Sequence, residues 1–200
     1  MGKRLFDLVV ALGALVLLSP LLAAVALVVK LDSPGPVFFR QERVGRHGRS
    51  FRIHKFRTMH HRPGAADGLP LTVGADPRIT RSGAWLRRTR IDELPQFLDV
   101  LAGNMSVVGP RPEVPRYVAH YPPELRARAL AVRPGITDPA SLEFIDESER
   151  LARAADPERE YVESILPRKV RRAADYAERA TLATDVAVLW RTLRVLAGGR

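Results

Sequence analysis

Residues 5–29, "LFDLVVALGALVLLSPLLAAVALVV", form a long apolar run in which Asp7 is the only charged residue. A helix of this length would reach about 37 Å, which is enough to cross the hydrocarbon core of a bilayer. The rest of the 200-residue chain is long enough for one domain. We therefore predict a helix-rich α+β protein, with a membrane-anchoring helix at residues 1–31 and a single domain at residues 32–200.

Two features indicate that the anchoring helix bends. Ser19 and Pro20 lie near its middle, where a proline removes one backbone hydrogen bond and clashes with the preceding turn. Both flanks are also basic, with Lys3 and Arg4 before the run and Lys30, Arg40, Arg43, Arg46 and Arg49 after it. This charge bias would hold both ends in the cytoplasm. A re-entrant helix broken at Ser19 and Pro20 and a kinked transmembrane span both fit, whereas Asp7 argues against a cleaved signal peptide.

The composition points to an anionic partner. The formal net charge is +10, and arginine supplies 28 of the 32 basic residues. Nucleic acid, anionic lipid and a phosphorylated substrate all suit this excess of guanidinium groups. The absence of cysteine excludes disulfides, thiolate catalysis and cysteine-rich zinc sites.

The segment after the anchor predicts a small β-hairpin with a basic surface. Residues 37–59 read as two short strands around a turn at residues 45–48. Residues 32–62 contain eight basic and two acidic side chains, a bias that anionic lipid headgroups would attract. Lys55 differs from the other basic residues because it stands between Ile53 and Phe56 in an apolar strand.

A long loop and two helices are expected next. Residues 62–84 are rich in Gly, Pro and Asp and predict a loop of the kind that often covers a substrate. A helix over about 80–90 should follow, then a turn, then a second helix opened by Pro95. Asp92 and Glu93 would stand at the mouth of that second helix. The free amides there favour negative charge, and they would also favour a bound phosphate.

The adjacent acids, Asp92 and Glu93, have two interpretations. Capping of the following helix is the simpler one. The second is a phosphate-handling site, since four arginines flank the pair: Arg87, Arg88, Arg90 and Arg111. Arg111 stands between Pro110 and Pro112, which stiffen its backbone. A carboxylate among arginines stays ionised, and an ionised aspartate can attack phosphorus or bind Mg²⁺.

Taken together, several stretches of the chain resemble the bacterial sugar transferase family, the monotopic phosphoglycosyl transferases that act on polyprenyl phosphates. They are the apolar helix interrupted by Ser19-Pro20, "HKFRTM" at 54–59, "RRTRIDELPQF" at 87–97, "GNMSVVGPRP" at 103–112 and "RPGIT" at 133–137. They occur in the family's order and spacing and cover most of residues 1–137.

The resemblance implies an enzyme at the cytoplasmic face of the bacterial inner membrane. Its helix would re-enter the cytoplasmic leaflet, which favours the hairpin over the span, and residues 32–200 would be a cytoplasmic catalytic domain. The implied reaction transfers a sugar-1-phosphate from a UDP-sugar to a polyprenyl phosphate such as undecaprenyl phosphate and releases UMP. This is the first membrane step of bacterial glycoconjugate synthesis. Mg²⁺ is the implied cofactor; membrane lipid is a partner, nucleic acid is not, and the chain could pair with a second copy of itself.

The same resemblance assigns roles to individual residues. Asp92 would be the nucleophile and a ligand of Mg²⁺, and Glu93 would position or assist it. Lys55, Arg87 and Arg111 match basic positions that bind substrate phosphates. Asn104 and Asp138 depart from the family pattern, which commonly has aspartate and glycine there, so neither carries a role over.

The last third of the chain reads as helical. Prolines divide residues 138–168 into short pieces, and residues 168–197 or so predict one amphipathic helix. This helix either packs on the core or lies at the membrane interface with Trp190 at the headgroup level.

Two rival functions remain open from the sequence. A membrane-tethered basic module could bind nucleic acid or anionic lipid without catalysis. An aspartyl-phosphate hydrolase would transfer the phosphoryl group to water.

Overall fold

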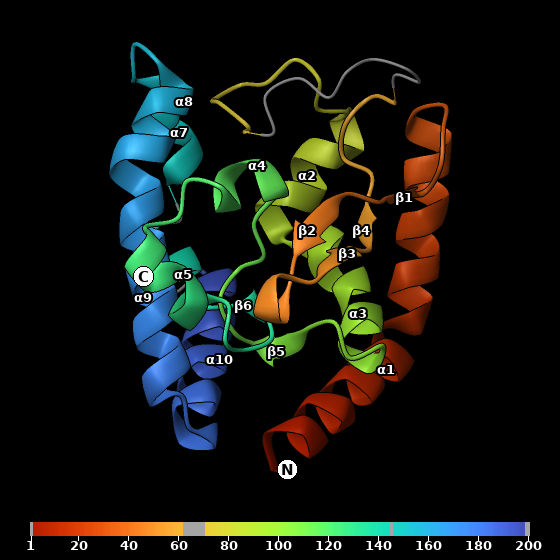
Figure 1. The fold of residues 1–200 in the computed structure, drawn as a ribbon. Helices are drawn as coiled ribbons and strands as arrows, with labels where there is room; N and C mark the ends of the chain where they lie inside the picture. Colours follow the sequence, from red (N-terminus) through yellow and green to blue (C-terminus); the bar gives the residue numbers. More distant parts are fainter. Residues whose placement is uncertain (1, 62–70, 145, 199–200) are drawn as a thin grey trace.

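The computed structural model describes residues 2–61, 71–144 and 146–198. In Figure 1, helix α1 lies along one side of the molecule and the C-terminal helices along the other, with short strands and helices between them. The first half of the chain contributes α1 (Gly2–Asp32), β1 (Phe38–Phe39), β2 (Glu42–Val44), a 3₁₀ turn (Arg46–Gly48), β3 (Ser50–Arg52), β4 (Lys55–Phe56), α2 (Arg81–Thr89), the 3₁₀ helix η2 (Ile91–Gln96) and α3 (Phe97–Leu101). The fold is helix-rich with a few short strands, as predicted.

Helix α1 is continuous through Ser19 and Pro20 and changes direction partway along its length (Figure 1). The Ser19 hydroxyl donates a hydrogen bond of 2.8 Å to the carbonyl of Val16. This is the carbonyl that the amide of residue 20 would bond in an uninterrupted helix, and proline has no amide hydrogen to offer. The predicted break is therefore a bend, and the serine replaces the lost donor. The helix is long and apolar enough to cross a membrane.

Hydrogen bonds hold both ends of α1 to the same domain. Near the N-terminus, Asp7 is buried and accepts from the Ser106 hydroxyl (2.9 Å) and the Val107 amide (3.0 Å). At the other end, Asp32 accepts from the Ser82 hydroxyl at 2.8 Å. The buried Arg57 guanidinium donates to carbonyls at the C-terminal end of the helix, those of residues 29 and 33.

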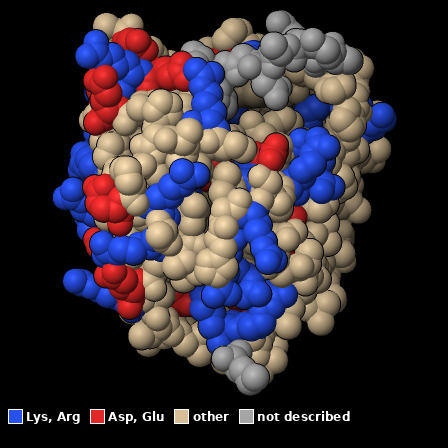
Figure 2. Space-filling view, in the orientation of Figure 1, with Lys and Arg blue, Asp and Glu red and all other residues tan. Residues whose placement is uncertain are grey.

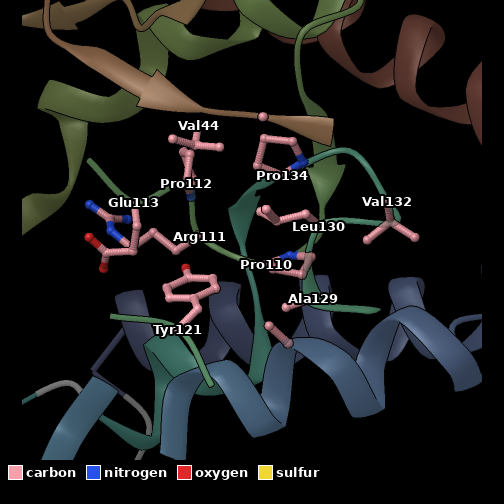
Figure 3. A pocket seen from close by; sticks show the side chains of 12 residues that line it. Val44, Pro110, Arg111, Pro112, Glu113, Tyr121, Ala129, Leu130, Val132 and Pro134 are labelled. Atoms are coloured by element: carbon pink, nitrogen blue, oxygen red, sulfur yellow. The ribbon is translucent and has the colours of Figure 1, made fainter. Parts of the chain in front are cut away.

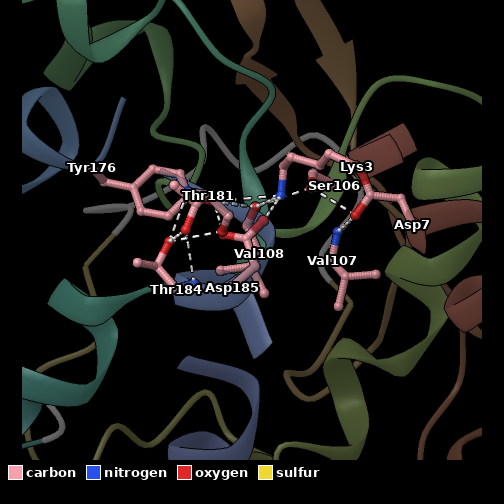
Figure 4. A network of polar contacts seen from close by, with 9 residues as sticks. All are labelled: Lys3, Asp7, Ser106, Val107, Val108, Tyr176, Thr181, Thr184 and Asp185. Carbon is pink, nitrogen blue, oxygen red and sulfur yellow. Dashed lines mark hydrogen bonds and ion pairs between the residues drawn. The ribbon is translucent and has the colours of Figure 1, made fainter. Parts of the chain in front are cut away.

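The polar network around the N-terminus of α1 joins three distant segments (Figure 4). The Lys3 ammonium donates to the Val108 carbonyl at 3.0 Å and forms an ion pair with the fully buried Asp185. The Tyr176 hydroxyl lies 2.6 Å from Asp185 Oδ1 and 2.9 Å from the Val108 carbonyl. The charge that interrupts the apolar run, Asp7, thus belongs to the domain's internal hydrogen bonding.

The strands form three two-stranded sheets among the described residues. Strands β2 and β3 pair antiparallel around the turn, as predicted, with His47 in the left-handed region at φ 57°. Outside them, β1 pairs antiparallel with β4, which completes the hairpin. Strand β5 (Ser106–Val108) pairs parallel with β6 (Gly135–Thr137). A Cβ on Gly135 would lie 2.0 Å from the Gly109 amide nitrogen, so glycine permits this close approach.

The structure describes only part of the predicted long loop and confirms the helix predicted after it. Residues 62–70 of the loop lie outside the described residues, and residues 71–80 contain only an isolated bridge between Met59 and Ile79. Helix α2 begins after Thr80, whose side chain accepts from the Gly83 amide, and it matches the helix predicted over 80–90.

The C-terminal part is helical, but the single helix predicted at about 168–197 is wrong. The chain instead forms α9 (Leu166–Arg179) and α10 (Leu182–Leu196), because Ala180 is extended and Thr181 starts a new helix through a capping box with Thr184. The remaining elements are α4 (Pro115–Val118), α5 (Pro123–Ala129), α6 (Pro139–Glu143), α7 (Glu147–Ala152), α8 (Pro157–Glu160) and the π-helical turn η3 (Tyr161–Ile165).

Candidate active site

A cleft of about 570 Å³ lies between the β-hairpin, α2 and η2 on one side and the short helices α4, α6 and α7 on the other. Its volume is typical of pockets that bind small molecules. All five residues predicted for catalysis or phosphate binding line it: Lys55, Arg87, Asp92, Glu93 and Arg111. They come from four separate segments of the chain.

Asp92 and Glu93 lie in the first turn of the 3₁₀ helix η2. Arg90, in the left-handed conformation at φ 59°, separates this helix from α2. The predicted second helix thus begins at Ile91 and runs through Pro95, rather than opening at that proline. The carboxylates nevertheless stand at a helix start, as predicted, and both are buried.

Lys55 bridges the two acids. Its Nζ lies 3.0 Å from Asp92 Oδ2 and 3.0 Å from Glu93 Oε1. The neighbouring His54 is held by the fully buried Asp99, whose carboxylate accepts from the His54 amide and contacts its Nδ1, each at 2.8 Å. These bonds fix the strand that carries the lysine, so the ammonium is held in place before any ligand arrives.

Glu93 is the most strongly paired carboxylate of the site. Arg111 donates to it from Nη2 (2.5 Å to Oε1) and Nη1 (3.2 Å to Oε2). Burial by itself raises the pKa of Glu93, but the charges of Arg111, Lys55 and Arg90 and the hydrogen bond from Arg111 outweigh it. The pKa therefore lies well below its usual range. The same pairing raises the pKa of Arg111, so both groups are ionised at neutral pH.

Asp92 is 2 % exposed, and its two oxygens differ. Oδ2 pairs with Lys55, whereas Oδ1 is buried and has no hydrogen-bond partner among residues 2–61, 71–144 and 146–198. Buried carboxylate oxygens are nearly always partnered, so this one is available to a ligand. Asp92 belongs to the lining of a cleft that also contains Lys55, Arg87 and Arg111.

Mg²⁺ fits this site only if the protein and the substrate share its coordination. The described part of the chain holds no cluster of three or more side chains that could bind a metal by themselves. Mg²⁺ is commonly held through one or two carboxylates, with substrate phosphates and water completing its octahedron. The free Oδ1 of Asp92 fits that mode, whereas the oxygens of Glu93 are already engaged by Arg111 and Lys55.

The prolines on either side of Arg111 pack away from the cleft. Pro110 and Pro112 line a separate small cavity of about 20 Å³, together with Pro134 and Tyr121 (Figure 3). The Arg111 amide donates to the buried carboxylate of Asp138 at 3.3 Å.

Asp138, which departs from the family pattern, is an N-cap that sequence reasoning missed. It accepts from the Ser141 amide at 2.7 Å at the start of α6. The Asp-Pro pair before a helical segment was the available signal. Asn104, the other departure, is exposed and is not among the residues that line the cleft.

Arg87 reaches the cleft because α2 approaches the strand region closely. A Cβ on Gly83 would lie 2.1 Å from the Thr58 carbonyl oxygen, so glycine permits this packing. Arg87 then donates to the Thr72 hydroxyl at 2.6 Å, and burial lowers the pKa of its guanidinium.

One wall of the cleft was not foreseen from the sequence. It comes from the helices after residue 114 and consists of Tyr117, Ser141, Phe144, Glu147, Tyr161 and Lys169. We call these six residues the C-terminal wall. No motif or spacing relates them in the sequence, since five of them stand on five different helical elements and Phe144 directly follows α6.

Comparison with known proteins places the chain in a family. The family model described as "Bacterial sugar transferase" matches residues 1–199. The chain is similar to the UDP-glucose:undecaprenyl-phosphate glucose-1-phosphate transferase of Caulobacter vibrioides, with 40% identity over 96% of this chain and 68% of that protein. It is also similar to the UDP-N-acetylgalactosamine-undecaprenyl-phosphate N-acetylgalactosaminephosphotransferase of Aeromonas hydrophila, with 38% identity over 98% of this chain.

A third relative, the exopolysaccharide production protein PSS of Rhizobium leguminosarum bv. phaseoli, is 55% identical over 54% of each chain. The alignments span about half of the Rhizobium protein and 44% of the Aeromonas protein. The match of the family model over nearly the whole sequence is what decides the assignment. The chain belongs to the bacterial sugar transferase family.

Proposed function

We propose that this chain is a phosphoglycosyl transferase that moves a sugar-1-phosphate from a UDP-sugar to undecaprenyl phosphate and releases UMP. The observation that carries the proposal is the unpartnered, buried Oδ1 of Asp92 in a cleft lined by Lys55, Arg87 and Arg111. The Caulobacter and Aeromonas relatives are named as enzymes that transfer sugar phosphates to undecaprenyl phosphate.

The proposed mechanism has two displacements at one phosphorus atom. The Asp92 carboxylate attacks the donor's β-phosphorus, forming an aspartyl–phosphosugar bond while the bond to the bridging oxygen breaks and its electrons leave with UMP. An oxygen of the lipid phosphate then attacks the same phosphorus and frees the Asp92 carboxylate. A covalent route lets a soluble donor and a lipid acceptor use one site in turn.

The side chains around Asp92 supply charge and position. Phosphoryl transfer depends mainly on alignment and on neutralising the equatorial oxygens. Lys55 contacts Asp92, Arg111 lines the same cleft, and Glu93 holds both cations through ion pairs. Asp92 would also hold Mg²⁺, which when bound neutralises charge on the donor's diphosphate.

The membrane placement that we propose is a re-entrant α1 in the cytoplasmic leaflet of the bacterial inner membrane, with residues 32–200 as the catalytic domain in the cytoplasm. Support comes from the hydrogen bonds that tie both ends of α1 to the same domain. A simple transmembrane span would place these two ends on opposite faces of the membrane.

The surface of the molecule also suits this placement. Apolar side chains on α1 are exposed, including Leu5, Val16, Leu17 and Leu31. Figure 2 shows Lys and Arg side chains along the middle of one face, over the β2–β3 hairpin; Arg46, Arg49 and Arg52 there are exposed. Such a surface suits anionic headgroups.

Helix α10 provides a second membrane contact in this arrangement. Its exposed large apolar residues are Leu182, Val186, Trp190, Leu193 and Leu196, whose spacing places them on one helical face. The Lys3–Asp185 ion pair joins this helix to the start of α1. The interfacial position of Trp190, one of the two alternatives predicted from the sequence, therefore suits the structure. Helix α9 contributes buried residues to the core, and α10 packs on the core through Val188 and Leu189.

Trp190 fluorescence should report this contact. In a Trp85→Phe variant reconstituted in lipid bilayers, lipids brominated near the headgroup should quench Trp190 more than lipids brominated at the chain end. Tryptophan prefers the headgroup level, which is the physical reason. The Trp190→Phe variant, which retains Trp85, is the control for quenching elsewhere. Equal and weak quenching by both lipids would contradict the placement of α10.

The function itself is tested by UMP release from a panel of UDP-sugars, with the purified full chain in nanodiscs, Mg²⁺ and undecaprenyl phosphate. The proposal expects UMP release that requires the lipid acceptor and produces a lipid-linked sugar diphosphate. Sustained UMP release without any acceptor would favour the hydrolase. No release from any UDP-sugar, with tight binding of polyanions instead, would favour the basic binding module.

A further inference from the structure

The C-terminal wall carries two buried hydroxyl groups without a protein partner. The Tyr117 side chain is almost fully buried at 1% exposure, and within the described ranges its hydroxyl has no hydrogen-bond partner. The buried Oγ of Ser141 is likewise unpartnered among those residues. Burying a hydroxyl without a partner is unfavourable, and most such groups in native proteins meet a ligand or water. Both residues are among those that line the cleft.

Neighbouring polar groups of the same wall are already engaged. The Tyr161 hydroxyl donates to Glu113, and the Lys169 ammonium lies 2.5 Å from Glu147. Among the described residues of this wall, Glu147 Oε2 also lacks a hydrogen bond but forms the ion pair with Lys169, whereas the hydroxyls of Tyr117 and Ser141 have neither. Burial raises the pKa of Tyr117 to about 12, so its hydroxyl is protonated at neutral pH and can both donate and accept.

The aromatic rings of the wall are poorly placed to stack on a nucleobase. The Arg168 guanidinium lies over the Phe144 ring and the Lys169 ammonium over the Tyr161 ring, each 5.2 Å from the ring centroid. The rings of Tyr117 and Tyr161 pack on each other, with centroids 4.8 Å apart and planes inclined by 53°. These rings therefore already contact other protein groups, whereas the hydroxyls of Tyr117 and Ser141 have no hydrogen-bond partner among the described residues. This combination suits a ligand rich in hydroxyl groups better than a flat base.

We propose that the C-terminal wall binds the sugar residue of the donor, and that Tyr117 and Ser141 hydrogen-bond its hydroxyl or acetamido groups and thereby select the sugar. The inference rests on the proposed function, because it assumes that the donor's phosphates lie between Lys55 and Arg111. The sugar is attached to the phosphorus that Asp92 attacks, so it must lie within the same cleft. A site built to pair with a substrate hydroxyl discriminates strongly against a donor that lacks it.

The test compares Tyr117→Phe and Ser141→Ala with the wild type in steady-state transfer to undecaprenyl phosphate. KM and kcat are measured for several UDP-sugars that differ at one hydroxyl or acetamido group, together with the inhibition constant of UDP, which has no sugar. We expect KM for the preferred donor to rise about tenfold, the effect of one net hydrogen bond. The preference among sugars should shrink, while kcat and inhibition by UDP change little.

Tyr161→Phe is the matched control, since it removes a hydroxyl from the adjacent ring. Its hydroxyl is bonded to Glu113, so this variant should unfold at a lower temperature than the wild type. Tyr117→Phe removes an unpartnered group and should leave the unfolding temperature unchanged or raise it. A fall in the unfolding temperature of Tyr117→Phe, with kinetics unchanged, would assign Tyr117 a structural role and overturn the inference.

Two further results would also overturn it. Unchanged KM values and sugar preference in both variants would show that neither hydroxyl meets the sugar. A tenfold weaker inhibition by UDP, matching the rise in KM, would place the contact on the nucleotide instead. In both cases the wild type still transfers the sugar-phosphate, so the proposed function stands; a wild type that uses no UDP-sugar would remove both.

Discussion

Replacing Asp92 with asparagine is expected to lower kcat for sugar-phosphate transfer by at least about 10⁴-fold, the usual cost of losing a nucleophile. Asparagine keeps the shape of the side chain, but its amide cannot attack phosphorus. Because Lys55, which pairs with Asp92, keeps its ion pair with Glu93, the variant should still fold. The measurement is transfer from a UDP-sugar to undecaprenyl phosphate, with thermal unfolding recorded on the same samples.

A trapping experiment tests whether Asp92 is the nucleophile or only an ion-pair partner of Lys55. A donor labelled in its sugar, supplied without acceptor, should leave label on the wild-type protein and none on Asp92→Asn. Lys55→Met also breaks the ion pair but keeps the carboxylate, so it should acquire label at a lower rate. Labelling of Asp92→Asn equal to that of the wild type would exclude a covalent bond to this residue. If the variant instead binds anions more tightly and the wild type transfers nothing, the basic binding module is favoured.

Replacing Glu93 with glutamine should lower both stability and activity. The substitution leaves Lys55 and Arg111 without their shared counter-charge, which should cost about 2 kcal/mol in the free energy of unfolding. This loss of stability is smaller than the usual cost of breaking a fully buried ion pair, because the side chains of Lys55 and Arg111 keep some contact with water. We expect kcat to fall about 100-fold, because the cations that stabilise the reacting phosphate lose their positions.

The stability loss should depend on pH in a defined direction. The folded-state pKa of Glu93 lies well below its usual value, which is about 4.3 in an unfolded chain. Its contribution is therefore complete above that unfolded value and is lost as the pH falls through the lower, folded-state pKa. The difference in unfolding free energy between wild type and Glu93→Gln should shrink between pH 7 and pH 3, measured by urea denaturation. Glu160→Gln, which breaks a more exposed pair with Arg150, is the control and should cost about 1 kcal/mol or less.

Much of the architecture followed from local sequence signals. The apolar run, the hairpin turn at 45–48 and the start of α2 each depend on residues within a few positions of one another. The same is true of the bend in α1, since Pro20 and Ser19 act on a carbonyl one turn away. The single C-terminal helix was mispredicted because the periodicity of its apolar residues continues across Thr181, although α9 has ended before this residue and a capping box there begins α10.

Some features of the candidate active site could likewise be predicted from adjacent residues, whereas others depend on the tertiary fold. Asp92 and Glu93 are adjacent, and the arginines near them in the sequence are enough to indicate a charged cluster. Their distances to Lys55 and Arg111 depend on how β4, η2 and the segment after β5 are brought together. The hydroxyls of Tyr117 and Ser141 had no recognisable pattern, since each is ordinary in its own helix.

Residue chemistry and short-range periodicity were enough to predict a helix-rich protein with a long apolar N-terminal helix and an acid pair among arginines. Those properties depend on side-chain type and on contacts a few residues apart. Packing between segments as much as 100 residues apart decided which oxygen of Asp92 has no partner among the described residues and why Asp7 stands in an apolar helix. It also decided which buried hydroxyls of those residues are left without a partner. Pairing over such separations depends on the whole fold, because no local rule selects one partner among many of the same type.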